Sequence, residues 1–175
     1  MKKLLIVLTV LALFAGFAFA EGILVGEKPV KLEISGKDGG RLDKTPWCSS
    51  ELNTTAWCLF YVDPDESDLN TLAEETLDAE DISKDLLKTV AVINYKATKL
   101  PAFAVTMVLN GKQKKYPDTL YLKDGNSVFV NKWGLTDNTY CTLVFNKNGV
   151  LVYRKDGKMS EEDVADYIKT IKANL

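Results

Sequence analysis

The sequence predicts one α/β domain with a central mixed β-sheet flanked by helices. Three dense apolar runs, at residues 57–62, 90–93 and 141–145, have the aromatic and β-branched content of buried strands. Segments of helical composition separate these runs, and strands that alternate with helices favour parallel pairing. A turn and a returning strand after the third run predict an antiparallel hairpin, which makes the sheet mixed.

Residues 1–20 have the pattern of a cleavable secretory signal. Two lysines precede an uncharged apolar run that ends in the small residues Ala18 and Ala20. The run is shorter than the ~20 apolar residues of a membrane-spanning helix, and no cysteine for a lipid anchor precedes Cys48. We therefore expect an exported periplasmic protein, cleaved after Ala20, in which residues 21–175 form a single domain without a membrane anchor.

The composition argues against several classes of function. The chain has 22 Lys and Arg against 24 Asp and Glu, whereas a general nucleic-acid binder carries a basic stripe. It has no histidine, which removes the commonest metal ligand and the commonest general base near neutral pH. The sequence also has no P-loop, G-x-S-x-G or zinc-ligand spacing. We expect no nucleic-acid partner, no metal and no cofactor.

The first half of the domain is predicted to hold two strands and a long helix. Residues 29–34 alternate loosely and predict a strand, which a glycine-rich turn at residues 35–40 ends. Residues 48–52 suit one helical turn before the buried strand. Residues 67–88 have helical composition, with an apolar face made of Leu69, Leu72, Ala73 and Thr76 and then Ile82, Leu86 and Leu87.

A second helix is predicted after the strand at residues 90–93. Pro101 suits its first turn, and the helix runs to about residue 113. Its apolar side chains are Phe103, Val105, Met107, Val108 and Leu109. A short strand at residues 119–122 and a short helix at residues 128–135 follow.

The chain is predicted to end with a hairpin and a helix. The turn signal of residues 146–149 joins the third buried strand to a returning strand at residues 150–153. Ser160 and Asp163 have the spacing of a capping box that begins the last helix. The core-facing stripe of this helix consists of Val164, Tyr167, Ile168 and Ile171.

This order of elements is that of the thioredoxin-like fold, and several motifs resemble one family within it. The motifs are Pro46-Trp47-x-Ser49, the segment 62–66 after the first buried strand, and residues 130–135, 143–149 and 155–162. Together they resemble the YtfJ-type family of periplasmic thioredoxin-fold proteins over most of the chain, from about Gly26 to the end. The resemblance implies export and a thioredoxin-like fold, and it brings no defined catalytic activity.

The resemblance locates the position where redox members of the fold have their C-x-x-C, after the first buried central strand. This chain has no sulfur there and instead has Asp63, Pro64, Asp65, Glu66 and Ser67. The start of a helix favours carboxylates, so capping is the simple interpretation of this acidic run. A metal site at Asp63–Asp68 is a weaker alternative, because cations are disfavoured at a helix N-terminus.

Redox members also carry a cis-proline before the later central strand. This chain has Tyr140 and Cys141 there, and we expect a trans peptide because a cis bond without proline costs ~3 kcal/mol. Together with residues 63–67 we interpret these two residues as a vestigial active-site region that holds no catalytic residue. Cys141 is either a reactive thiol beside this region or a small buried core residue, and the sequence favours the second.

The other two cysteines leave their pairing open. Cys48 and Cys58 lie ten positions apart, and an oxidising compartment would permit a disulfide between them. The alternative is that both stay unpaired, with Cys58 packed in the sheet. A bridge from Cys58 to Cys141 is disfavoured because the two strands should run antiparallel.

Three hypotheses about function follow. The first is a non-catalytic binding or interaction module for an unknown periplasmic protein or peptide, which the fold without its redox landmarks favours. The second is an atypical thiol–disulfide oxidoreductase that uses Cys48, Cys58 or Cys141. The third is a weak binder of a metal or small solute at Asp63–Asp68.

Overall fold

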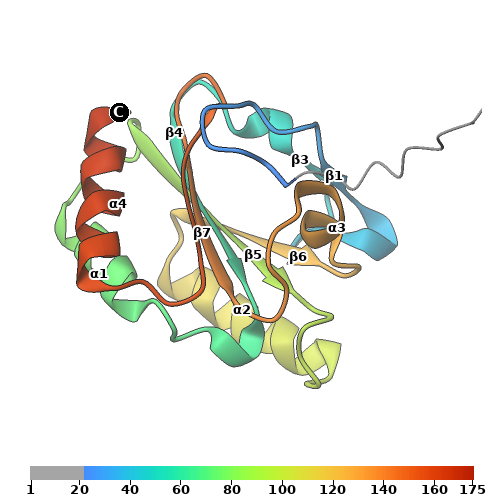
Figure 1. The fold of residues 1–175 in the computed structure, drawn as a ribbon. Helices are drawn as coiled ribbons and strands as arrows, with labels where there is room; N and C mark the ends of the chain where they lie inside the picture. The colour runs from blue at the N-terminus through green and yellow to red at the C-terminus, as the bar shows by residue number, and fades with distance from the viewer. Residues whose placement is uncertain (1–21) are drawn as a thin grey trace, which may run out of the picture.

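The computed structural model describes residues 22–175, so the predicted signal at residues 1–20 lies outside the described part of the chain. A six-stranded sheet forms the centre of the domain, with helices on both faces (Figure 1). Its strand order is β2-β6-β5-β4-β7-β8. The strands are β2 Gly39–Arg41, β6 Thr119–Asp124, β5 Leu87–Asn94, β4 Ala56–Val62, β7 Tyr140–Phe145 and β8 Leu151–Asp156. β4, β5 and β6 run parallel while the other pairings are antiparallel, which confirms the predicted mixed sheet.

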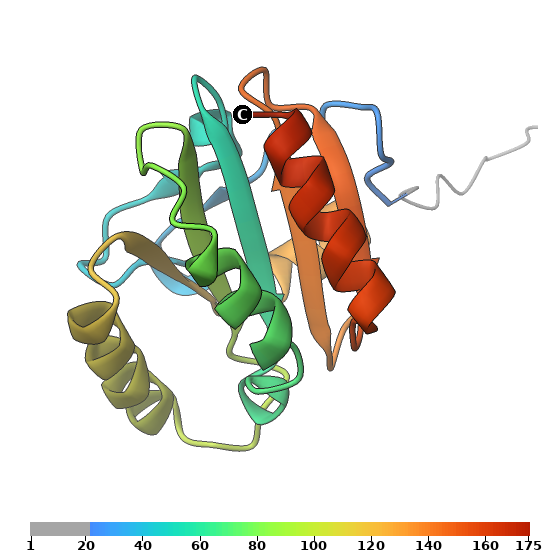
Figure 2. The same cartoon turned by 90° about the vertical axis from the view of Figure 1, so that its left-hand side faces the viewer.

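Alternate side chains of β4 enter two separate cores, because successive residues of a strand face opposite sides. Phe60 and Val62 belong to the first core, and Leu59 and Tyr61 belong to the second. Three helices lie on the first face, as Figure 2 shows: α1 Thr71–Ala79, α2 Ala102–Lys115 and α4 Glu161–Ala173. The second face is covered by α3 Val128–Trp133 and by a small sheet of β1 Glu33–Ile34 and β3 Trp47–Cys48.

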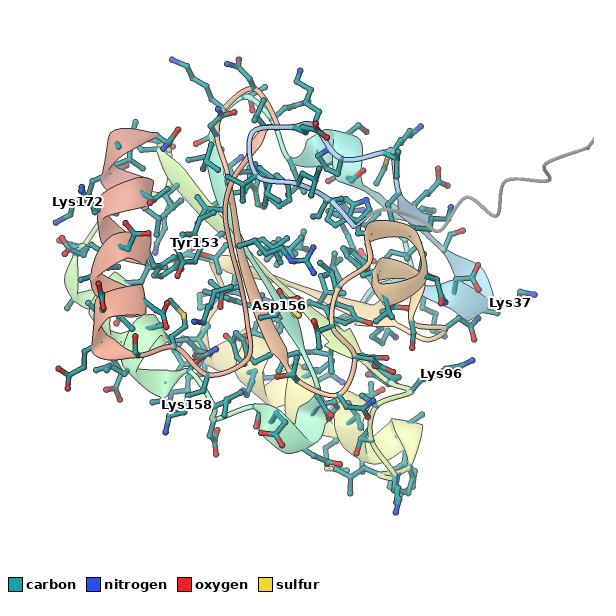
Figure 3. All side chains as sticks on the ribbon, in the orientation of Figure 1. Lys37, Lys96, Tyr153, Asp156, Lys158 and Lys172 are labelled. Carbon is teal, nitrogen blue, oxygen red and sulfur yellow. The ribbon has the colours of Figure 1, made fainter. Side chains whose placement is uncertain are left out.

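The last helix forms as the sequence predicts. The Ser160 hydroxyl accepts the Asp163 N–H at 3.1 Å, and the Asp163 carboxylate accepts the Ser160 N–H at 2.9 Å, which completes the capping box. The predicted stripe is buried and consists of Val164, Tyr167, Ile168 and Ile171. From the neighbouring strand β8, Tyr153 points toward this helix (Figure 3), and its ring centroid lies 5.5 Å from that of Tyr167.

A buried carboxylate begins the short helix α3. Asp124 ends β6 and is completely buried. Its two oxygens accept the N–H groups of Val128 at 2.9 Å and Phe129 at 3.0 Å, and the Tyr61 hydroxyl donates to it at 3.1 Å. A side chain at the end of one element thus satisfies the otherwise unpaired donors of the next.

The N-terminal region holds fewer and different strand residues than predicted. Of the strand predicted at residues 29–34, only the two residues of β1 form a ladder. The predicted glycine turn at residues 35–40 contains a 3-10 turn at Gly36–Asp38, and the edge strand β2 follows it from Gly39. Gly39 is required there, since a Cβ atom would lie 1.8 Å from the Lys123 carbonyl oxygen of β6. Pattern alone did not find this strand because glycine weakens any strand signal.

The helix predicted at residues 67–88 is wrong in length. A 3-10 turn at Pro64–Glu66 comes first, α1 has nine residues, and β5 begins at Leu87. Leu87 pairs with Ala56 in the parallel ladder instead of continuing a helical stripe. Leu72, predicted on the buried face, is exposed. Pairing of β5 with the central strand β4 therefore outweighed the helical composition of this segment. Tertiary contacts commonly override intrinsic helix propensity in this way.

Helix α2 has the predicted position, with Pro101 at its N-cap. Only Val105 and Leu109 of its five predicted apolar side chains are buried. Phe103, Met107 and Val108 are exposed, since the helix contacts the sheet along a narrow strip. Within residues 22–175 no helix has the length and apolarity that crossing a membrane requires.

Candidate functional site

The acidic segment after β4 is occupied by its own capping interactions. Asp63 is buried, and its carboxylate accepts the Asp65 N–H at 2.9 Å at the start of the 3-10 turn. Burial raises the pKa of Asp63. The Asp65 carboxylate accepts the Thr98 hydroxyl at 2.9 Å. No group of three or more acidic or cysteine side chains within residues 22–175 is arranged to hold a metal ion, so the geometry adds nothing to the metal hypothesis for this segment.

Cys141 faces the second core. It pairs with Tyr61 in the ladder and is completely buried, and its thiol donates to the Thr136 carbonyl at 3.4 Å. Burial, reinforced by the nearby Asp156 carboxylate, raises the pKa of the Cys141 thiol to about 12. The thiol is therefore protonated at neutral pH. The peptide bonds here are trans, and residues 22–175 contain no cis bond.

Cys58 and Cys48 occupy two further separate surroundings. Cys58 lies in the first core, where the Tyr167 hydroxyl donates to its sulfur at 3.3 Å and burial raises its pKa to about 12. Cys48 is half-buried in β3, beyond the opposite face of the sheet, and the Ser50 hydroxyl donates to its sulfur at 3.0 Å.

Cys48 and Cys58 are not bridged in this structure. All three cysteines are free thiols. The central sheet separates Cys48 from Cys58, because the strand that carries Cys48 packs on the second core through Trp47. The expected antiparallel pairing of the strands that carry Cys58 and Cys141 is confirmed, and these two thiols also belong to opposite cores.

A groove of about 510 Å³ runs along the first face of the sheet between α1 and α2. Figure 2 shows the two helices that flank it, beside α4. Its floor consists of side chains from four strands: Phe60, Val62, Ala91, Ile93, Tyr121 and Tyr140. Three residues of the predicted vestigial region, Pro64, Ser67 and Tyr140, also line it, whereas Asp63 and Cys141 do not.

Three side chains of the groove floor keep a small contact with solvent. Phe60, Ala91 and Tyr121 retain 6%, 8% and 6% of their exposure, whereas Leu59, Val92 and Leu122, on the same strands but facing the second core, retain 0%. Side chains of four strands thus form an apolar floor that helices cover only in part, with a small area left to solvent.

One hydrogen bond joins the floor to the α1 wall. The Tyr140 hydroxyl donates to Glu74 Oε1 at 2.6 Å. Burial, together with the Glu74 carboxylate, holds the pKa of Tyr140 well above its usual range, so the hydroxyl remains a donor. The same two causes raise the pKa of Tyr121 to about 12. This hydrogen bond holds the Glu74 carboxylate over the aromatic floor.

The two walls of the groove have opposite character. The α1 side and the segment that follows it contribute the acids Glu74, Glu75, Asp78 and Asp81. The α2 side is apolar, with Leu100, Val105, Val108, Leu109 and Tyr116. Two lysines, Lys84 and Lys112, complete the charged lining. Sequence reasoning missed this groove, because Phe60, Tyr121 and Tyr140 have the pattern of ordinary core residues.

The family is established by comparison with known proteins. The family model described as "Bacterial protein of unknown function (YtfJ_HI0045)" matches residues 42–174. The chain belongs to this family. It is 25% identical over 96 residues to "Uncharacterized protein YtfJ" of Escherichia coli strain K12, a match that covers 54% of this chain and 52% of the relative. The chain thus spans about half the length of this curated relative.

Solved structures confirm the thioredoxin-like fold. A candidate thiol:disulfide interchange protein, DsbE, from Chlorobium tepidum has a TM-score of 0.62 at 13% identity, covering 87% of this chain and 99% of that chain. The thiol peroxidase of Chromobacterium violaceum has a TM-score of 0.61 at 11% identity, and the match covers 88% of this chain and 89% of that chain. The exposed lipoprotein thioredoxin Etrx1 of Streptococcus pneumoniae has a TM-score of 0.52 at 16% identity, and the match covers 79% of this chain and 98% of that chain. At such identities the likeness concerns the fold alone.

Proposed function

We propose that this protein is an exported thioredoxin-fold binding module without thiol catalysis, which holds part of a protein or peptide partner in the groove between α1 and α2. The observation that carries the proposal is the groove itself, whose apolar floor spans four strands and reaches solvent. Its volume of about 510 Å³ lies within the roughly 300–1,000 Å³ of ligand pockets. A few polar groups on a mainly apolar lining are also typical of binding sites.

The state of the thiols supports binding over catalysis. Cys58 and Cys141 are completely buried with pKa values raised to about 12, and Asp63-Pro64-Asp65-Glu66 stands where redox members have sulfur. A thiol–disulfide exchange reaction needs an accessible thiolate of lowered pKa. The thiols on the central strands meet neither requirement.

The binding proposal is tested with Nile red, a neutral dye that fluoresces in apolar sites. Thr89 is half-buried in the groove lining, so Thr89→Phe would fill the groove at a position with room for a larger side chain. The matched control is Thr170→Phe, at a half-buried threonine on α4 outside the groove. We expect the dye to bind the native protein and the control, and to bind the Thr89 variant at least about tenfold more weakly. Equal binding by all three proteins would contradict the proposal.

The second candidate is a thiol oxidoreductase that acts through Cys48. Cys48 is the one cysteine with partial exposure, and its sulfur accepts a hydrogen bond from the Ser50 hydroxyl. The candidate predicts that the protein accelerates the reduction of insulin by dithiothreitol and that Cys48→Ser abolishes this activity. The binding proposal instead expects no acceleration by either protein.

Export is tested on the same protein expressed in a Gram-negative host. We expect the protein in the periplasmic fraction, with Glu21 as its first residue by mass spectrometry, as the signal pattern of residues 1–20 predicts. A cytoplasmic chain that retains Met1 would contradict this part of the proposal.

A further inference from the structure

The groove has a charge asymmetry that the apolar floor alone does not require. Helix α1 contains acids and no lysine or arginine, whereas α2 contains three lysines and no acid. In the lining, Glu74, Glu75, Asp78 and Asp81 outnumber the lysines Lys84 and Lys112. A ligand that fills the groove therefore has apolar surface beneath it and mainly negative charge along one side.

The Glu74 carboxylate is held ready for a cation. Its Oε1 atom accepts the Tyr140 hydroxyl at 2.6 Å. No lysine or arginine within residues 22–175 forms an ion pair with it, as the four ion pairs of this region all involve other acids. A carboxylate fixed by one hydrogen bond loses less conformational freedom when a second donor arrives, which is the advantage of preorganisation.

The groove is long, which favours an extended polypeptide over a compact small molecule. Leu87, Thr89, Ala91 and Ile93 all line it along β5. At ~3.3 Å per residue this side of the groove spans about 20 Å, the length of about six residues of extended chain. The spacing of the α1 acids is close to that of alternate residues in an extended chain. Glu74 and Asp78 are separated by ~6 Å of helix rise, and alternate residues of an extended chain are separated by ~6.6 Å.

We propose that the groove binds an extended segment of a partner protein in which apolar and basic side chains alternate. The apolar side chains pack on Phe60, Ala91 and Tyr121, and the lysines or arginines pair with Glu74 and Asp78. This inference rests on the proposed binding function and adds the chemistry of the partner. Charge complementarity of this kind contributes mainly to specificity and to the rate of association.

The test uses three synthetic peptides of about ten residues, in which leucine alternates with lysine, glutamate or glutamine. Binding of fluorescein-labelled peptide to the full chain is measured by fluorescence anisotropy at low salt and at about 1 M salt, where the Debye length is ~3 Å. We expect the lysine peptide to bind at least about tenfold more tightly than the glutamate peptide at low salt, and this ratio to shrink at high salt.

A charge-matched pair of variants assigns the effect to the groove. Glu74→Gln, Asp78→Asn and Asp81→Asn together remove three charges from the acidic wall, and the amide oxygen introduced by Glu74→Gln can still accept the Tyr140 hydroxyl. The control removes three charges from exposed positions on α4 with Glu161→Gln, Glu162→Gln and Asp166→Asn. We expect the wall variant to weaken lysine-peptide binding by about five- to tenfold and the control by less than about twofold, since each exposed pair contributes little by itself.

The outcomes separate this inference from the proposed function. If all three peptides bind with equal affinity and each displaces Nile red from the groove, the charge inference is overturned and the proposed binding function stands. Absence of both peptide and dye binding would overturn both. Equal losses in the wall variant and in the α4 control would show a general charge effect and would also overturn the inference.

Discussion

The two faces of the central sheet are built from the same strands and differ in what covers them. On the second face, β1, β3 and α3 cover the middle of the sheet, and Leu59, Val92 and Leu122 have no exposure. On the first face, α4 and α1 cover one half, but α2 stands apart from α1 and leaves the groove. Equally apolar strands therefore make a sealed core or a binding surface according to the spacing of the layer above them.

The sealed face owes its density to an aromatic cluster around Phe129. The ring centroids of Trp47, Tyr61 and Trp133 lie 5.8, 5.4 and 5.1 Å from that of Phe129. These rings come from β3, β4 and α3, so the cluster ties the small sheet and α3 to the central sheet. Aromatic pairs at such distances add stability beyond the area that they bury. We therefore expect the sealed face to dominate the stability of the domain.

The largest expected effect comes from opening the sealed face. Phe129→Ala removes the centre of the aromatic cluster and leaves a cavity, which should lower the free energy of unfolding by about 3–5 kcal/mol. Chemical denaturation measures it, with Val108→Ala on the exposed groove wall as the control. A loss below about 1 kcal/mol would show that the second face is not the stable half.

The next largest effect should come from Asp124, the carboxylate beneath that cluster. Asp124→Ala leaves the Tyr61 hydroxyl and the N–H groups of Val128 and Phe129 without their acceptor. Unsatisfied buried donors cost about 1–3 kcal/mol each, and partial rearrangement should leave a net loss of about 3 kcal/mol. Amide hydrogen exchange at Val128 and Phe129 checks the mechanism, since unchanged protection there would mean that α3 does not depend on this cap.

A smaller effect is expected on the grooved face. Tyr140→Phe removes the hydrogen bond to Glu74 and keeps the ring, so unfolding free energy should fall by about 1 kcal/mol. Tyr121→Phe is the matched control on the same floor. The pKa of Tyr121 is raised by burial and by nearby charge, and no hydrogen bond within residues 22–175 contributes to that shift. If both variants lose the same stability, the Tyr140 hydroxyl has no special role in the groove.

The smallest effect concerns pH at the start of α4. The hydrogen-bonded ion pair with Lys155 and the Ser160 N–H and hydroxyl lower the pKa of Asp163 to about 2. Because this value lies below the ordinary value near 3.9 of an unfolded chain, the stabilisation is present above pH ~4 and is lost as the pH falls toward about 2.

The check for Asp163 is a comparison of native and Asp163→Asn proteins by urea unfolding. The native protein should be the more stable at pH 7, and the two midpoints should converge between pH ~4 and about 2. If the difference between the two unfolding midpoints stays constant over this pH range, the substitution acts through the cap geometry alone.

Local patterns predicted most elements because their signals are contained within a few residues. The capping box at Ser160 and the stripe through Tyr167 define α4 without help from the rest of the chain. The seven buried residues of β4 follow directly from an apolar run between breakers. The absence of sulfur after β4 was equally visible in the sequence.

Where a segment depended on a distant partner, the pattern was insufficient. Leu87 belongs to β5 because Ala56 pairs with it, and Gly39 is in a strand because it pairs with Asp124 of β6. Side-chain periodicity records which face of an element is apolar, and it does not record which neighbour covers that face.

Three features follow from the amino-acid sequence alone: the thioredoxin-like order of elements, the family resemblance and the loss of the redox landmarks. Two features are visible only in the folded protein: the sheet keeps Cys48 and Cys58 apart, and Tyr140 meets Glu74 in a groove. The reason is physical: a strand's pattern specifies two apolar faces, but the spacing of α1 and α2 above one face is set by long-range packing. That spacing determines whether Phe60 and Tyr121 are part of a sealed core or the floor of a site.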